Sequence, residues 1–315
     1  MRERKFLFIF LCFSFLFPLL FILFFITLKE FTFEGFYFDT YVSGKIYVKN
    51  PIIAKNFIKD IKREFERINS LEIMGIKNGV VDTTIVTILK EALFVSKNTN
   101  GYFDPSVDPI LKKWNYFKEP RIPYKEEIKA LLSFVDYKKI KFKKDTLFMP
   151  EEFSINIGGA AKGYALNRAK SLFNKYGISS GLVNAGGDIL VVGKKRGKKD
   201  WRIGIRHPRD YNGIIGVLKV SDCFVFTSGD YERYFMKEGK RYHHIVNPYS
   251  GYPSLGIIGA TVIAKEGIKG DCIATALMAM EIEKAIEFVK KNKIEAILVD
   301  TAMNIHKFID IKKYE

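Results

Sequence analysis

Asn156-Ile157-Gly158-Gly159-Ala160-Ala161-Lys162-Gly163-Tyr164-Ala165 is the stretch around which the fold and a candidate site are organised. The apolar run 153–157 predicts a short strand, and the apolar spacing after Gly163 predicts a helix. A strand that turns through glycines into a helix leaves backbone N–H groups available to an anion, and Lys162 adds positive charge. The stretch matches neither the P-loop spacing nor GxGxxG. It indicates a turn that binds a phosphorylated small molecule, although a purely structural turn also uses glycines.

The N-terminus carries an apolar segment, residues 6–28, that contains no charged side chain and is long enough to cross a bilayer as a helix. Arg2, Arg4 and Lys5 precede it, which favours a cytoplasmic N-terminus. A cleaved signal peptide has the same basic start and apolar middle. The run is long and bulky, however, and ends without a small-x-small cleavage site. We therefore predict a basic cytoplasmic tail, an uncleaved transmembrane signal anchor, a linker and an extracytoplasmic domain, at residues 1–5, 6–28, 29–36 and 37–315.

The formal net charge of +16 comes from 51 Lys and Arg against 35 Asp and Glu, spread along the chain. The one dense basic run, 194–199, lies between two apolar segments and is typical of a solvated hairpin loop. Because no RNP, zinc-finger or helix-turn-helix pattern accompanies the charge, nucleic-acid binding is excluded as a function. Cys223 and Cys272 could pair outside the cytoplasm, but no CxxC motif is present, and the sequence favours buried free thiols.

Strands and helices alternate along the rest of the chain. The alternating pattern of 36–48 predicts a strand pair or one long strand, and 201–206 predicts a half-buried strand. Segments 56–68 and 83–98 have helical spacing. Segment 180–193 reads as two strands joined by Ala-Gly-Gly-Asp.

Asp271 and Thr275 stand four residues apart near the start of a predicted helix, so that their oxygens share one face. Hard oxygen ligands of this kind suit Mg²⁺, which keeps waters and binds phosphate oxygens. An aspartate favoured by the helix dipole and a threonine bonded back to the chain would explain the same pair without a metal.

Two further positions carry possible chemistry. Segment 241–253 contains two of the four histidines, His243 and His244, and no carboxylate at metal spacing, which argues against zinc. A histidine beside a Pro/Gly loop suits a general base, because its pKa lies near neutrality. Ser228 lacks the GxSxG context of a nucleophile, so we expect a turn or ligand-binding hydroxyl there.

Six motifs occur in order along the chain: Gly-Tyr-Phe-Asp-Pro, Gly-Gly-Ala-Ala-Lys-Gly-Tyr-Ala, Val-Asn-Ala-Gly-Gly-Asp, Thr-Ser-Gly-Asp-Tyr-Glu-Arg, His-His-Ile-Val-Asn-Pro-Tyr-Ser-Gly-Tyr-Pro and Asp-Cys-Ile-Ala-Thr-Ala-Leu. From about Tyr37 to the C-terminus, this succession resembles the ApbE-type FAD:protein FMN transferases. The resemblance implies an α+β fold: a single ApbE-like, T-fold-related domain with antiparallel sheets and packed helices, preceded here by one N-terminal transmembrane helix.

The resemblance also implies an activity. FAD is the substrate and Mg²⁺ the cofactor, and the FMN moiety passes to a Ser or Thr hydroxyl of an acceptor protein with release of AMP. The implied acceptors are flavoprotein subunits of extracytoplasmic redox complexes, and the implied location is the bacterial cytoplasmic membrane, with the catalytic domain outside. Magnesium-dependent FAD pyrophosphatase activity, or a non-catalytic flavin-binding assembly factor, are the alternatives.

By position, the resemblance assigns His244 as the catalytic base. It assigns the metal to Asp271, Thr275 and the backbone carbonyl of Gly159. The expected contacts to the flavin nucleotide are Phe38, Tyr102, Phe103, Asp104, Asn156, Lys162 and Ile245, with Ser228 and Asp230 lining the same cavity.

Three positions depart from the family pattern. Asn156 stands where many members have Asp, Ala274 stands where some members carry a further acid, and segment 69–74 looks shortened. These departures could weaken flavin or metal binding, but none removes a part that the chemistry requires.

Overall fold

The computed structural model describes residues 27–73, 76–116 and 118–313. Most of the predicted anchor 6–28, and all of the basic tail before it, lie outside these residues. Within the described ranges, no helix is both long enough and apolar enough to cross a membrane.

The centre of the described structure is an eight-stranded sheet in which every neighbouring pair is antiparallel. Its order is β1-β2-β6-β7-β10-β13-β14-β15. The strands are β1 (Lys29–Tyr37), β2 (Thr40–Val48), β6 (Gly181–Ala185), β7 (Asp188–Val192), β10 (Cys223–Gly229), β13 (Ile257–Ala264), β14 (Glu295–Asp300) and β15 (Ile305–Phe308).

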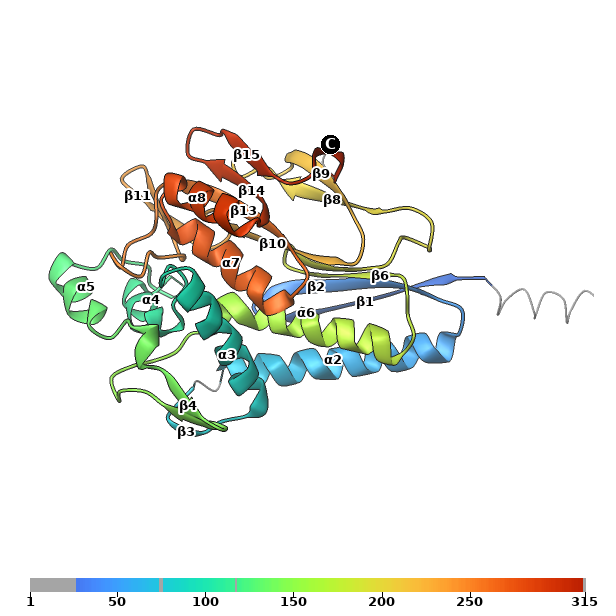
Figure 1. Cartoon of the computed structure of the whole chain (residues 1–315), viewed down its shortest axis with the longest axis horizontal. Helices are drawn as coiled ribbons and strands as arrows, with labels where there is room; N and C mark the ends of the chain where they lie inside the picture. Colours follow the sequence, from blue (N-terminus) through green and yellow to red (C-terminus); the bar gives the residue numbers. More distant parts are fainter. Residues whose placement is uncertain (1–26, 74–75, 117, 314–315) are drawn as a thin grey trace, which may run out of the picture.

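Helices cover one face of this sheet (Figure 1). They are α2 (Pro51–Ile73), α3 (Thr83–Asn98), α6 (Gly158–Lys175), α7 (Gly267–Ala279) and α8 (Ile282–Asn292). The largest core lies between the two layers, where Phe57 of α2 and Leu166 of α6 meet sheet residues such as Phe226. The other face is covered by the hairpin of β8 (Trp201–Arg206) and β9 (Ile214–Val220), whose Trp201 packs in a second core.

Smaller elements close one end of the layers. Helices α4 (Asp108–Trp114) and α5 (Lys125–Leu132) share a third core with the hairpin of β11 (Tyr234–Lys237) and β12 (Lys240–His243). The remaining elements are β3 (Gly79–Val80), β4 (Lys141–Lys143), β5 (Thr146–Phe148) and the 3₁₀ turns η1 (Pro105–Val107), η2 (Tyr137–Lys139) and η3 (Ile311–Lys313).

The glycines of the opening stretch allow α6 and α7 to touch through their main chains. A Cβ on Gly163 would lie 2.6 Å from the carbonyl oxygen of Gly267, and a Cβ on Gly267 would lie 2.2 Å from the carbonyl oxygen of Gly163. Neither contact leaves room for a side chain. Close approach, rather than positive φ, therefore explains these glycines.

Much of the predicted secondary structure is confirmed. The helix at 83–98 has the expected bounds, the strand at 201–206 is β8, and 180–193 forms the β6–β7 hairpin. The helix expected at 56–68 is the longer α2. The mixed fold with antiparallel sheets and packed helices is as expected, and the basic run 194–199 is exposed.

Three expectations need correction. Residues 153–157 form no strand, and the N–H of Asn156 bonds instead to the carbonyl of Pro105 at 2.8 Å. Segment 29–36, expected as a linker, forms most of β1 because its alternating residues pair with β2. Helix α7, expected from Gly270, begins at Gly267, so Asp271 lies in its second turn. The interpretation of Cys223 and Cys272 as buried free thiols is confirmed.

Candidate active site

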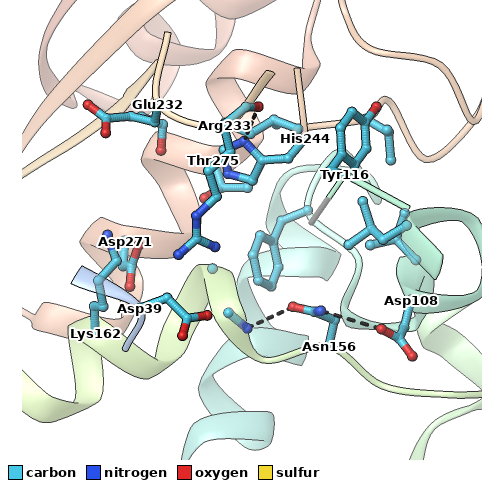
Figure 2. A pocket seen from close by; sticks show the side chains of 18 of the residues that line it. Asp39, Asp108, Tyr116, Asn156, Lys162, Glu232, Arg233, His244, Asp271 and Thr275 are labelled. Carbon is cyan, nitrogen blue, oxygen red and sulfur yellow. Dashed lines mark hydrogen bonds between the residues drawn. The ribbon is translucent and has the colours of Figure 1, made fainter. Parts of the chain in front are cut away.

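A cavity of about 660 Å³ opens beside the start of α6. Side chains from segments far apart in the sequence converge on it (Figure 2). The predicted site residues that line it are Phe38, Tyr102, Phe103, Asp104, Asn156, Gly159, Lys162, Ser228, His244, Ile245, Asp271 and Thr275. The fold thus brings together residues from all six motifs.

The facing turns of α6 (Gly158–Gly163) and α7 (Gly267–Thr275), which we call the helix junction, form one wall. Gly159 departs from helical geometry, with φ −84° and ψ 17°, and a Cβ there would lie 3.2 Å from the Thr275 hydroxyl oxygen. Asp271 is 4% exposed, and its Oδ2 accepts a hydrogen bond from the Gly163 N–H at 2.8 Å. This carboxylate therefore satisfies an N–H group at the start of α6, where the helix dipole also favours negative charge.

The oxygen-bearing groups of the helix junction fit a hard divalent cation. Asp271 and Thr275 line the cavity together with Gly159, and their carboxylate, hydroxyl and backbone carbonyl oxygens are of the kind that a hard cation prefers. The described residues contain no group of three or more His, Cys, Asp or Glu side chains arranged to hold a metal. A site with few protein ligands suits Mg²⁺, which retains several waters and shares its remaining positions with phosphate.

Lys162 forms an ion pair with Asp188 on the neighbouring strand β7. Asp188 is 2% exposed, and its Oδ1 also accepts a hydrogen bond from the N–H of Thr227 at 3.1 Å. Burial lowers the pKa of Lys162, but the carboxylates of Asp188 and Asp271 outweigh this effect and raise the pKa above its usual value. Lys162 is therefore a positive charge at neutral pH. The sequence interpretation missed Asp188, although it ends the Ala-Gly-Gly-Asp motif.

His244 is held by the backbone of Arg233. The carbonyl oxygen of Arg233 lies 3.0 Å from the His244 backbone nitrogen and 3.2 Å from its Nδ1. Since a carbonyl oxygen only accepts hydrogen bonds, Nδ1 carries the proton and Nε2 carries the lone pair. Burial, followed by the charge of Arg233, lowers the pKa of His244 to about 3. The ring is therefore neutral and able to accept a proton at physiological pH.

Arg233 itself was missed by the sequence interpretation, although it ends the Thr-Ser-Gly-Asp-Tyr-Glu-Arg motif. It lies in the turn between β10 and β11 and lines the cavity. In Figure 2 its guanidinium points into the cavity, toward the space between Asp271 and Asp39.

Asn156, the first departure from the family pattern, lies two residues before the start of α6. Its Oδ1 accepts a hydrogen bond from the Gly158 N–H at 2.8 Å, and its Nδ2 donates to Oδ1 of Asp108 at 3.4 Å (Figure 2). Asp108 also binds Lys112 at 2.6 Å. The amide thus bonds the turn into α6 while it stays in the cavity wall. Ala274, the other departure within a motif, is fully buried in the helix-sheet core and does not belong to the cavity lining.

The wall at residues 102–104 is stabilised by its own hydrogen bonds. Asp104 accepts from the N–H and hydroxyl of Ser106 at 2.8 and 2.6 Å, and from the N–H of Tyr137 at 2.9 Å. Burial raises the pKa of Asp104, although these hydrogen bonds oppose the rise. Its carboxylate is thus engaged in shaping the wall, and contact with a nucleotide stays a prediction.

Of two more residues predicted to line the cavity, Phe38 does so and Asp230 does not. Phe38 lies in the β1–β2 turn with a positive φ of 56°, and its N–H donates to Oδ1 of Asn69 at 2.8 Å. Asp230 is not among the described residues that line the cavity, where we expected it. Its carboxylate accepts two hydrogen bonds from Arg209, both at 2.7 Å, and one from Arg241 at 3.3 Å.

Comparisons with known proteins identify related sequences and structures. The sequence model of the ApbE family matches residues 38–298. Proteins named FAD:protein FMN transferase are similar to the chain: that of Treponema pallidum is 29% identical over 67% of this chain and 64% of its own length. The Vibrio cholerae protein is 30% identical over 70% of this chain and 67% of its own length. The Klebsiella pneumoniae protein is 28% identical over 81% of this chain and 84% of its own length.

Solved structures share the fold. The ApbE protein of Thermotoga maritima superposes with a TM-score of 0.80 and 29% sequence identity, covering 89% of this chain and 97% of that one. The flavin transferase ApbE of Vibrio cholerae superposes with a TM-score of 0.79 and 24% identity, covering 89% and 96%.

Proposed function

The chain belongs to the ApbE family, and from this premise we propose that it transfers the FMN moiety of FAD to a Ser or Thr hydroxyl of an acceptor protein and releases AMP. The curated relatives reported above are FAD:protein FMN transferases, the enzyme class that the motifs predict. The observation that carries the proposal is the juxtaposition in one cavity of a neutral histidine, a protonated lysine and the oxygen ligands of the helix junction.

The chemistry follows from these groups. The acceptor hydroxyl oxygen attacks the phosphorus of the FMN half of FAD, and the phosphorus–oxygen bond to AMP breaks. The hydroxyl proton passes to Nε2 of His244, which is the basic nitrogen because Nδ1 donates to Arg233. Lys162 stabilises negative charge on the transferring group and on the departing AMP.

Asp271, Thr275 and the carbonyl of Gly159 would hold Mg²⁺. The cation would neutralise charge on the diphosphate. The hydrogen bond from Gly163 to Asp271 orients this carboxylate before substrate binds.

The direct test is a labelling assay. The full-length chain, in detergent, is incubated with FAD, Mg²⁺ and an acceptor that carries the sequence Asp-x-x-Ser/Thr-Gly-Ala-Ser/Thr. We expect a fluorescent flavin that stays on the acceptor after denaturation, and an unlabelled acceptor would contradict the proposal. Asp271→Ala should abolish labelling, whereas Glu287→Ala, an exposed acid on α8, should not.

The two alternative functions give different results in the same assay. A Mg²⁺-dependent FAD pyrophosphatase would use water in place of the acceptor hydroxyl, so FAD would disappear at the same rate with and without acceptor. A binding factor would retain FAD and release no AMP. The buried position of Ala274 removes one argument for the binding factor, since an acid there would point into the core.

Membrane attachment belongs to the proposal as well. The basic residues before segment 6–28 support an anchor with the catalytic domain outside the cytoplasm. A reporter enzyme active only outside the cytoplasm, fused after Glu315, should be active. Removal of residues 1–28 should release the chain from the membrane fraction.

A further inference from the structure

Arg233 places a second organic cation in the cavity, beside the proposed base. Its carbonyl oxygen binds His244, and its side chain lines the same cavity as Lys162 and Asp271. Figure 2 shows the guanidinium directed inward, into the space that these side chains surround. Its charge also lowers the pKa of both His244 and Lys162, so it acts on the two sides of the cavity.

The charges around this space explain what a second cation would do. Six acidic residues line the cavity, among them Asp39, Asp188 and Asp271, against the four basic residues Lys112, Lys118, Lys162 and Arg233. A substrate that adds the negative charge of a diphosphate therefore needs positive charge directed at it. A divalent cation at the helix junction supplies part of it, and the inward-directed guanidinium of Arg233 supplies more from beside His244.

Three other arginines lie near this turn, and each pairs with a carboxylate outside the helix junction. Arg206 pairs with Glu232 at 3.4 Å, and Arg209 and Arg241 pair with Asp230 at 2.7 and 3.3 Å. None of these three lines the cavity in the described structure, whereas Arg233 does. A guanidinium offers planar paired donors that match two oxygens of a phosphate.

We propose that Arg233 is a catalytic residue whose guanidinium binds the non-bridging oxygens of the phosphoryl group being transferred, next to His244. The inference rests on the proposed function and adds a residue to it. Charge on these oxygens is stabilised as the acceptor oxygen approaches and the bond to AMP breaks. The backbone carbonyl of the same residue orients the base, so one residue places both groups around the reacting phosphorus.

The two roles can be separated experimentally, because a side-chain substitution leaves the carbonyl of residue 233 in place. Arg233→Ala should lower kcat for flavin transfer by about 10²–10³-fold, the range found when one donor to a developing charge is removed. Guanidinium ion added to the buffer should restore part of this loss. Arg233→Lys should retain charge without the paired donors and lie between Arg233→Ala and the wild type.

Arg206→Lys is the matched control, since it keeps its partner Glu232 and lies outside the cavity lining; its kcat should stay within about twofold of wild type. Retention of wild-type kcat in both Arg233 variants would overturn the inference. A loss that guanidinium does not restore, together with an altered circular dichroism spectrum, would also overturn it, because the residue would then act only on folding.

A binding measurement separates this inference from the proposed function. Calorimetry with inorganic pyrophosphate and Mg²⁺ should show at least about tenfold weaker binding to Arg233→Ala than to the wild type or Arg206→Lys. If the wild type labels no acceptor, the proposed transfer fails, and this difference still decides whether Arg233 binds a diphosphate. Equal affinity of the three proteins, or no binding to the wild type, would overturn the inference.

Discussion

The two walls of the cavity are built in different ways. At the helix junction, polar groups bind one another and the main chains of α6 and α7 touch: Asp271 accepts from Gly163, and Lys162 pairs with Asp188. A second wall, which we call the turn wall, consists of Ser228, Gly229, Glu232 and Arg233 with His244 and Ile245. There the base is attached to its neighbour through a single carbonyl oxygen, that of Arg233.

This difference predicts how each wall responds to substitution. At the helix junction the contacts that shape the site also stabilise the fold, so activity and stability should fall together. On the turn wall the base is fixed through one side-chain hydrogen bond in the described structure, to the carbonyl of Arg233, so activity should fall while the fold persists. The predictions below test this distinction.

The largest effect is expected from His244→Gln on the turn wall. Loss of the base should lower the rate of flavin transfer by about 10²–10⁴-fold. The free energy of unfolding at pH 7 should change by less than about 0.5 kcal/mol, because within the described structure the neutral ring makes one side-chain hydrogen bond, to the carbonyl of Arg233. Labelling kinetics and urea unfolding measure the two quantities. A loss of stability comparable to that of helix-junction variants would remove the distinction between the walls.

The pH dependence of stability sharpens this first test. The pKa of His244 is lowered to about 3 in the folded protein, against about 6.5 when unfolded. As the pH falls below 6.5, the unfolded chain takes up a proton that the folded chain does not, so the wild type loses stability. His244→Gln lacks this loss, and at pH 5 its stability relative to wild type should rise by up to about 2 kcal/mol. An equal stability difference at pH 7 and pH 5 would contradict the assignment of a neutral ring.

Asp188→Asn on β7, which removes the partner of Lys162 in the helix junction, should reduce both activity and stability. The substitution leaves Lys162 without its carboxylate partner and weakens the bond from the Thr227 N–H. Since the Lys162 side chain is 26% exposed, we expect a loss of about 2–3 kcal/mol, below the cost for a fully buried pair. Flavin transfer should fall at least about tenfold, because Lys162 loses the partner that positions it. If the free energy of unfolding stayed unchanged while flavin transfer fell, Asp188 would act in the reaction and not in stabilising the fold.

Gly163→Ala tests the backbone contact between α6 and α7. The new Cβ would meet the carbonyl oxygen of Gly267 at 2.6 Å, so the helices must separate. Overpacking of this kind costs about 1–3 kcal/mol and should displace Asp271 from the Gly163 N–H. Gly204→Ala in β8 is the matched control, since its Cβ meets only Ile214 at 3.4 Å, and we expect a change below about 0.5 kcal/mol. Equal unfolding midpoints for both variants would show that the contact is dispensable.

The difference between the walls also explains what could be predicted from sequence. Helix α3 and the β6–β7 hairpin follow from apolar spacing and turn residues, which are local signals. The site residues Lys162, His244 and Asp271 were recognised through ordered motifs, and the fold brings them to one cavity. Residues 153–157 were misread as a strand, because an apolar run does not reveal that Asn156 bonds to Pro105, far away in sequence.

Asp188 and Arg233 show which site residues could not be predicted from the sequence. Both end recognised motifs, but their roles depend on a partner from another element: Asp188 on Lys162, and Arg233 on His244. Asp230 shows the reverse case, since the family resemblance placed it in the cavity, whereas its carboxylate pairs with Arg209 and Arg241 outside the lining. Pairings between distant segments are set by tertiary packing, which spacing along one sequence does not encode.

The smallest effect is expected beside the turn wall, at Tyr116. Its ring stacks on Trp114 at a centroid distance of 5.6 Å, but its buried hydroxyl has no hydrogen-bond partner among the residues that the structure describes. Tyr116→Phe should therefore raise the free energy of unfolding by about 1 kcal/mol. Tyr176→Phe is the opposing control: its hydroxyl donates to Asp60 at 2.7 Å, so this variant should lose about 1 kcal/mol. Because the stacked ring is retained in Tyr116→Phe, flavin transfer should stay within about twofold of wild type. A destabilised Tyr116→Phe would reveal a partner for the hydroxyl, and a large loss of transfer would place that partner on the substrate.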